Sequence, residues 1–232
     1  MDPPCKKYNF IGIDETGLGI GKDSIIVVAT STYDTALTKD VGYRKLKKSK
    51  DILVASEAYN REKNRLHYEN FPAFMTFNEM RENGLDNFYW TRARGGRFPL
   101  QLIEHLSIAH VVHTNGFNPN NTVLYIDAFH GNYDESKYII SESLKHDGFK
   151  IPKEQINIVP DGDRSVPLIN YADLLAFQIG LSMNERYEKY HHKKVRIDLK
   201  PHEIEYDSKR TLRPLTTESR DKLEEIVKRW RA

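Results

Sequence analysis

Hydrophobic residues along the chain form short continuous runs, typical of strands, and longer segments with helical spacing. Runs rich in β-branched and aromatic residues occupy 8–13 (YNFIGI) and 24–30 (SIIVVAT). The short glycine-containing segment between them is typical of a hairpin-like connection, so we expect two antiparallel neighbouring strands. Two further runs, 122–128 (TVLYIDA) and 155–160 (QINIVP), predict two more strands.

Helices are expected where apolar residues recur three and four positions apart. This spacing occurs at 100–114 and in the long amphipathic segment 167–188, which begins with a proline. A third helix, at 133–146, lies between the two later strands, and this order indicates a right-handed parallel crossover. A fourth helix is predicted at 217–230.

Strands and helices in this order predict an α/β fold, built on a mixed sheet with helices on both faces. We expect residues 1–232 to form a single domain. The polar, helix-permissive segment 56–71 and the aromatic-rich residues after it predict a mainly helical insertion around 50–115, with TRARGGRF at 91–98 as a loop. The last helix would extend the domain at its C-terminal end.

Acidic residues stand where the predicted strands end. They are Asp14 and Glu15 at the end of the first strand, Asp127 at the end of the third, Asp163 beyond the fourth and Asp173 on the helix that follows. Ligands of open α/β sheets bind beyond the strand ends. We therefore expect Asp14 and Asp127 to meet at one end of the sheet, with the following helix supplying one more acid.

Carboxylates that are forced together repel each other, and a divalent cation relieves that cost. Mg²⁺ and Mn²⁺ prefer carboxylate and water oxygens, and a pair of such ions can activate a water and stabilise the leaving oxygen of a phosphodiester. The acids therefore predict Mg²⁺- or Mn²⁺-dependent phosphoryl chemistry. Two alternatives stay open: Asp163 can be a helix cap, and Asp173 can be a polar residue beside an apolar helix face. Asp161 fits a turn.

Other catalytic classes fit the sequence less well. The chain has no G-x-S-x-G serine motif, and GLGIGK at 17–22 lacks the spacing of a phosphate-binding P-loop. The one cysteine, Cys5, excludes an internal disulfide and argues against a cysteine-based metal site. No apolar run is long enough for a membrane span and the first residues have no signal-peptide core, so we expect a cytoplasmic protein.

The composition is that of an ordinary globular protein, with 39% hydrophobic and 29% charged residues and a net charge of +2. This small net charge does not by itself predict nucleic-acid binding. Basic residues nevertheless gather at 39–50, 92–97 and 191–196. The candidates for holding a nucleic-acid backbone are Lys22, Lys45, Lys47, Lys48, Arg92, Arg94 and Arg97. For any single cluster, a solvated surface is the alternative interpretation.

Two segments resemble motifs of a known family. IGIDETGLG at 11–19, followed by SIIVVAT, resembles the D-E-[AS]-G opening of type 2 ribonucleases H and of their Asp-Glu-Ser-Gly relatives in the ribonuclease H-like superfamily. VLYIDAFHG at 123–131 resembles the second strand-end aspartate motif. The resemblance departs at Leu18, where type 2 enzymes carry the arginine of a G-R-G segment whose backbone helps to read a ribose 2′-hydroxyl.

The last part of the proposed site resembles both branches of that superfamily. Asp163 matches the type 2 spacing of an aspartate four residues before a proline, whereas INYADLLA matches the helix of the relatives and places the acid at Asp173. The resemblance implies a ribonuclease H-like fold and a metal-dependent nuclease. It assigns Asp14, Glu15 and Asp127 to the metal site, and one of the two later aspartates completes the set.

The acids, the basic clusters and the resemblance together predict a nuclease whose substrate is RNA or an RNA–DNA hybrid. A non-catalytic nucleic-acid-binding protein on the same fold is the main alternative. A small-molecule phosphohydrolase that uses the same ions is another, but it would not need three basic clusters.

Overall fold

The computed structural model describes residues 8–16, 24–42, 77–94, 99–114, 118–128, 132–146, 148–183, 199–206 and 217–231. The helix expected over 56–71 lies outside these ranges. Within them, no helix combines the length and the apolar character that crossing a membrane requires.

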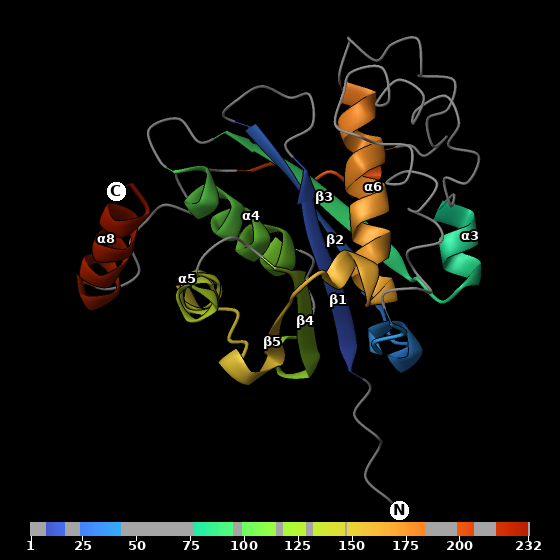
Figure 1. Cartoon of the computed structure of the whole chain (residues 1–232), viewed down its shortest axis with the longest axis horizontal. Coiled ribbons are helices and arrows are strands. Elements are labelled where there is room, and N and C mark those ends of the chain that lie inside the picture. The colour runs from blue at the N-terminus through green and yellow to red at the C-terminus, as the bar shows by residue number, and fades with distance from the viewer. Residues whose placement is uncertain are drawn as a thin grey trace, which may run out of the picture.

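A five-stranded sheet forms the centre of the fold (Figure 1). In chain order its strands are β1 (Asn9–Thr16), β2 (Ser24–Thr32), β3 (Asn87–Arg94), β4 (Thr122–Asp127) and β5 (Ile156–Val159). They lie in the order β3-β2-β1-β4-β5, with β2 antiparallel to β1 and β3, and with β4 parallel to β1 and β5. The four strands predicted from the hydrophobic runs are confirmed, as is the antiparallel pairing of the first two.

Strand β3 shows that the expectation of a mainly helical insertion at 50–115, with a loop at 91–98, is wrong in part. Residues 87–94 pair with β2 along their whole length and place Phe88 and Trp90 in the core. The helix that follows them packs against β2 and β3, so it also belongs to the main sheet-and-helix unit. The backbone partner of 87–94 is far away in the sequence, and no local pattern in the aromatic-rich segment reveals it.

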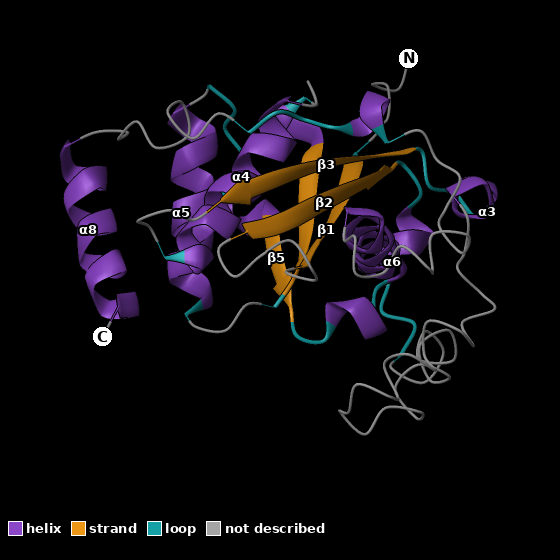
Figure 2. Cartoon of the chain, turned by 90° about the horizontal axis from the view of Figure 1, so that it is seen from above, coloured by secondary structure: helices purple, strands orange, loops and turns teal. Residues whose placement is uncertain are grey.

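Helices cover both faces of the sheet, as expected (Figure 2). They are α4 (Leu100–Thr114), α5 (Tyr133–His146), α6 (Pro167–Met183) and α8 (Thr217–Arg231), besides the short α3 (Phe77–Glu82). On one face α6 packs against β1 and β2, whereas on the other α4 packs against β2 and β3 and contacts α5. In turn α8 packs against α5. The four helices predicted within the described ranges are confirmed, with Met183 the last described residue of α6.

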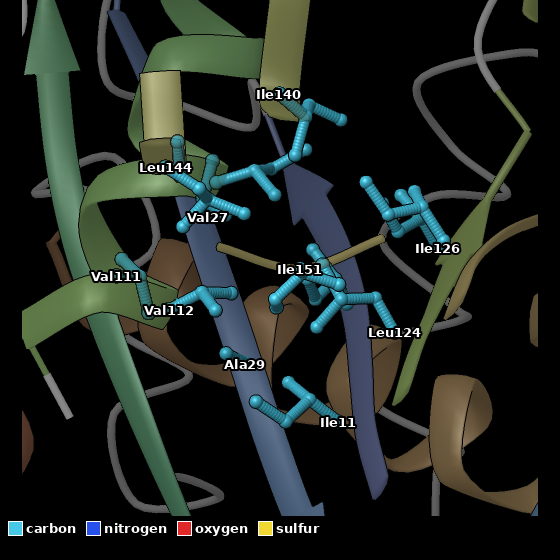
Figure 3. Packing of buried hydrophobic residues seen from close by; sticks show 14 of the residues in the cluster. Ile11, Val27, Ala29, Val111, Val112, Leu124, Ile126, Ile140, Leu144 and Ile151 are labelled. Carbon is cyan, nitrogen blue, oxygen red and sulfur yellow. The ribbon is translucent and has the colours of Figure 1, made fainter. Parts of the chain in front are cut away.

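Alternate residues of β1 enter two separate cores. Ile11 and Ile13 lie in the core between the sheet and the helices α4 and α5, as Figure 3 shows for Ile11 and its neighbours Leu124 and Ile126 of β4. Phe10 lies in the core beneath α6. Because successive side chains of a strand point to opposite faces, this alternation also decides which layer the residues at the end of β1 enter.

Strand β1 and helix α6 approach each other closely at Gly12. A Cβ atom at this position would lie 2.5 Å from the carbonyl oxygen of Leu168, in the first turn of α6. The buried hydroxyl of Thr30 on β2 lies within donating distance of two carbonyl oxygens, at 2.9 Å from Leu168 and 3.1 Å from Gly12. Gly12, which has no side chain, and the hydroxyl group of Thr30 therefore hold α6 directly against the sheet.

Residues 199–206 cover the outer edge of β3. The backbone N–H of Ile204 donates to the carbonyl of Trp90 at 2.8 Å, and the indole Nε1 of Trp90 donates to the carbonyl of Leu199 at 3.1 Å. The ring of His202 stacks on Phe88 with 4.2 Å between the ring centroids. This cover leaves less of the edge backbone open to pairing with another chain.

We expect Thr30→Val to lower the free energy of unfolding by about 1 kcal/mol, because the buried hydroxyl would lose its hydrogen bond to the carbonyl of Leu168 while the side-chain volume hardly changes. Urea-induced unfolding measures this change. The matched control is Thr35→Val at an exposed position, where we expect a change within about 0.5 kcal/mol. Equal effects of the two substitutions would contradict the importance of this contact.

Candidate active site

Parallel pairing of β1 and β4 places the first two strand-end acids side by side. Ile13 is in register with Ile126, so Asp14 and Asp127 follow one residue later at the same end of two adjacent strands. Neighbouring strands lie about 4.8 Å apart, which brings the two residues close together. Asp14 is buried and Asp127 is half-buried. The predicted meeting of these two residues at one end of the sheet is confirmed.

A tight turn after β5 is attached to Asp127. The Oδ1 atom of Asp127 accepts hydrogen bonds from the backbone N–H groups of Ala128 at 2.9 Å and of Gly162 at 2.8 Å. Gly162 begins the 3₁₀ turn Gly162–Arg164, and a Cβ there would lie 2.6 Å from Cδ1 of Ile169. The glycine thus lets the turn approach Asp127, and the turn carries Asp163 to the same place.

The sequence left open whether Asp163 or Asp173 completes the site. Both aspartates lie near enough to the strand-end acids to raise their pKa values, so position does not exclude either one. Asp163 comes from the turn after β5 and repels Asp127 more strongly than Asp173 does. Asp173 comes from α6 and repels Glu15 more strongly than Asp163 does. The two aspartates therefore act most strongly on different strand-end acids.

The electrostatics of the strand ends reflect crowded negative charge. Burial and, after it, the charges of Asp127, Asp173 and Asp163 together raise the pKa of Glu15 to about 7. Burial, followed by the charge of Asp163, raises the pKa of Asp127 to about 6, although its two backbone hydrogen bonds act in the opposite direction. Each carboxyl group is thus harder to ionise because the others are near.

A sixth acid, Glu104 of α4, also reaches this region, and our sequence interpretation did not include it. Its side chain is 9% exposed, and burial, followed by the charge of Glu15, raises its pKa well above the ordinary value. A signal for it exists in the sequence, because Glu104 is the only Asp, Glu, Lys or Arg in the helix LQLIEHLSIAHVVHT. A lone carboxylate in an otherwise apolar helix is costly unless something compensates it.

The donor chemistry of these acids fits Mg²⁺ or Mn²⁺, which prefer oxygen ligands. Burial and, after it, the repulsion of neighbouring acids raise the pKa values of Glu15 and Asp127, and a cation would relieve that repulsion. Among the residues that the structure places, however, no three His, Cys, Asp or Glu side chains are arranged to hold a metal ion. The carboxyl groups are therefore neighbours within electrostatic range rather than a preformed coordination set.

Two of the predicted basic residues lie at the same end of the sheet as the acids. Thr16 is in register with Ile26, and Ile26 is in register with Arg92, so Arg92 is two strands, or roughly 10 Å, from the end of β1. Arg94 follows on the same strand face, and both side chains are exposed. The other candidates lie outside the described residues: Lys22, Lys45, Lys47, Lys48 and Arg97.

The sheet arrangement agrees with what the resemblance implied. In the order β3-β2-β1-β4-β5, strand β2 runs against the other four, and helices cover both faces. This is the α/β fold with a mixed sheet that the sequence predicted. The acids Asp14 and Asp127 sit at the ends of its two adjacent central strands, β1 and β4.

Known proteins were also compared with the chain. No protein-family model and no curated protein sequence matches it. The RNase HII of Archaeoglobus fulgidus, in a complex with PCNA, is 17% identical, covers 96% of this chain and 90% of its own, and has a TM-score of 0.43. The ribonuclease H2 of Pyrococcus horikoshii OT3 is 15% identical over 97% and 89%, with a TM-score of 0.43. Bst-RNase HIII in complex with Mn²⁺ is 13% identical over 84% and 64%, with a TM-score of 0.41.

We expect the free energy of unfolding, measured in a chelator, to fall as the pH rises from about 4.5 to 7. In the folded protein Glu15 and Asp127 hold their protons to higher pH than in the unfolded chain, so the fold is stabilised below this window and loses that contribution as they ionise. Glu15→Gln should flatten the decline and be more stable than the wild type at pH 8.

The control for this pH series is Glu224→Gln, on the exposed side of α8, which should keep the wild-type slope. Denaturant titrations at matched ionic strength measure all three proteins. An unchanged slope in Glu15→Gln would mean that the acids do not repel each other in the folded protein.

Proposed function

We propose that this chain is a divalent-metal-dependent nuclease that hydrolyses phosphodiester bonds of RNA or of an RNA–DNA hybrid. The observation that carries the proposal is the meeting of acids from β1, β4, the turn after β5 and α6 at one end of the sheet. Such crowding of carboxyl groups destabilises a fold unless a cation binds to them or protons neutralise them. The choice of RNA or hybrid rests on the resemblance of IDETGLG to the type 2 opening.

The residues proposed to hold Mg²⁺ or Mn²⁺ are Asp14, Glu15, Asp127, Asp163 and Asp173. When bound, such ions supply Lewis-acid activation of a water and stabilisation of the departing oxygen. Binding requires the carboxyl groups to turn toward a shared position, because their described arrangement does not yet hold an ion. The hydrogen bonds from Ala128 and Gly162 hold one oxygen of Asp127 in place and leave the other to face a ligand.

The proposed path of the nucleic acid crosses the exposed end of β3. Arg92 and Arg94 lie on the same face of this strand and at the same sheet end as the acids. Guanidinium groups bind phosphates through paired hydrogen bonds, and a separation of roughly 10 Å from the end of β1 is within about two nucleotides of an extended strand. These arginines are therefore placed to hold the backbone while the acids act on a neighbouring phosphate.

We expect the purified protein to cleave labelled RNA or RNA–DNA hybrid in the presence of Mg²⁺ or Mn²⁺, and not in a chelator. Asp14→Asn and Asp127→Asn should each reduce the cleavage rate by at least about a hundredfold, because each removes a charged oxygen from the centre of the site. Rates on single-stranded RNA, single-stranded DNA and hybrid, measured under identical conditions, identify the substrate.

The matched control is Asp161→Asn, which makes the same chemical change two residues before Asp163. Asp161 is exposed and has a φ of 49°, a backbone region that asparagine tolerates, so this variant should keep wild-type cleavage. Binding of nucleic acid without cleavage by the wild type would instead favour the non-catalytic alternative. Cleavage that survives both Asp14→Asn and Asp127→Asn would place the chemistry elsewhere.

The double substitution Arg92→Gln and Arg94→Gln should weaken nucleic-acid binding for all sequences tested. Each lost phosphate contact should also reduce the slope of log K against log salt by about 0.7–0.9. Fluorescence anisotropy over a range of salt concentrations measures both effects. Lys150→Gln, an exposed change near the opposite end of the sheet, is the control and should leave affinity and slope unchanged.

A further inference from the structure

Glu104 faces the sheet rather than the solvent. On α4 it shares a helical stripe with Ile108 and Val111, four and seven residues later. Both of these residues lie in the core between the sheet and α4, and Figure 3 shows Val111 next to Val112 in that layer. The stripe therefore carries the Glu104 carboxyl into the same layer, toward the N-terminal end of the helix.

Glu15 enters this layer from the opposite side. It continues the alternation of Ile11 and Ile13, both of which lie in the core beneath α4 and α5. Asp14 has the opposite orientation, shared with Phe10 beneath α6. The proximity of Glu104 and Glu15 is also expressed in the raised pKa of Glu104, to which the charge of Glu15 contributes after burial. The two glutamates thus meet on the α4 side of the sheet end.

The described part of the chain leaves the carboxyl group of Glu104 incompletely hydrogen-bonded. Among the residues that the structure describes, none forms a hydrogen bond with the buried Oε1 atom of Glu104. The neighbouring His105 does not supply a positive charge, because burial lowers its pKa to about 4. A buried carboxylate oxygen with no donor is rare in folded proteins and costs free energy unless a ligand or ion satisfies it.

We infer that Glu104 belongs to the carboxylate site and that, together with Glu15, it binds a divalent cation on the α4 side of the sheet. This inference rests on the proposed metal-dependent function and extends it, because it adds a cation position separate from the acids that face α6. Two carboxylates offer the hard oxygen donors that Mg²⁺ and Mn²⁺ prefer, and water completes the coordination of such ions in many proteins. Glu15 connects this position with Asp127 and Asp173.

Titration of the full-length protein with Mn²⁺ tests the inference without any substrate. Free Mn²⁺ is measured by electron paramagnetic resonance in the wild type, in Glu104→Gln and in the exposed control Glu225→Gln. We expect Glu104→Gln to lose one class of bound ions or to bind it at least about tenfold more weakly, while the remaining class stays. The control should match the wild type.

The rise in melting temperature caused by Mn²⁺ gives a second measurement. Replacing a glutamate that had only a structural role would leave this rise unchanged. Mn²⁺ should raise the melting temperature of the wild type more than that of Glu104→Gln, whereas in a chelator at pH 8 the variant should be at least as stable, because one repelling charge is gone. The shorter Glu104→Asp keeps the charge and should retain part of the Mn²⁺ effect. Circular dichroism establishes that each variant is folded.

The two proposals fail in different ways. If the wild type binds no Mn²⁺, both the metal-dependent function and this inference are wrong. If the wild type binds Mn²⁺ and Glu104→Gln binds it with the same stoichiometry, affinity and thermal shift, only the role of Glu104 is wrong.

Discussion

The contact between α6 and the sheet at Gly12 determines where much of the candidate site can form. Because Gly12 has no side chain, the first turn of α6 rests directly on β1, and Thr30 holds both backbones through its hydroxyl group. From this fixed start, α6 carries Asp173 toward the end of the strand where Asp14 and Glu15 lie. A larger residue at Gly12 would move the helix, and with it the acid.

A second glycine has the same role on a smaller scale. Gly162 allows the turn after β5 to donate a backbone N–H to Asp127, and the turn then holds Asp163 beside it. The two glycines thus let the acids come close together, although their negative charges repel each other. The fold tolerates this arrangement because a large apolar core lies on each side of the sheet.

The site joins the two layers of the protein. Asp14 points toward the α6 side of the sheet, and Glu15 points toward the α4 side, because adjacent residues of a strand face opposite ways. An adjacent pair of acids at a strand end can therefore contact ligands in both layers. This geometry connects Asp173 on α6 with Glu104 on α4 through a single residue, Glu15.

Much of this protein follows from the sequence alone. The hydrophobic runs indicated β1, β2, β4 and β5, and the helical spacing indicated α4 and α6. The helices α5 and α8 were also predicted, and acids at strand ends indicated the location of the site. Local patterns sufficed because burial has a period of two in strands and close to four in helices. Acids after such runs are also conspicuous because charge is rarely left buried without compensation.

Only the tertiary structure decided the remaining features, and each depends on contacts between residues far apart in the chain. Residues 87–94 became a strand through pairing with β2, and the aspartates at 163 and 173 both reached the strand ends through the approach of the turn and of α6. Glu104, which the sequence interpretation did not include, comes near Glu15 through the packing of α4. The sequence specifies which residues are acidic or apolar, but the distances between them are set by the packing of whole elements.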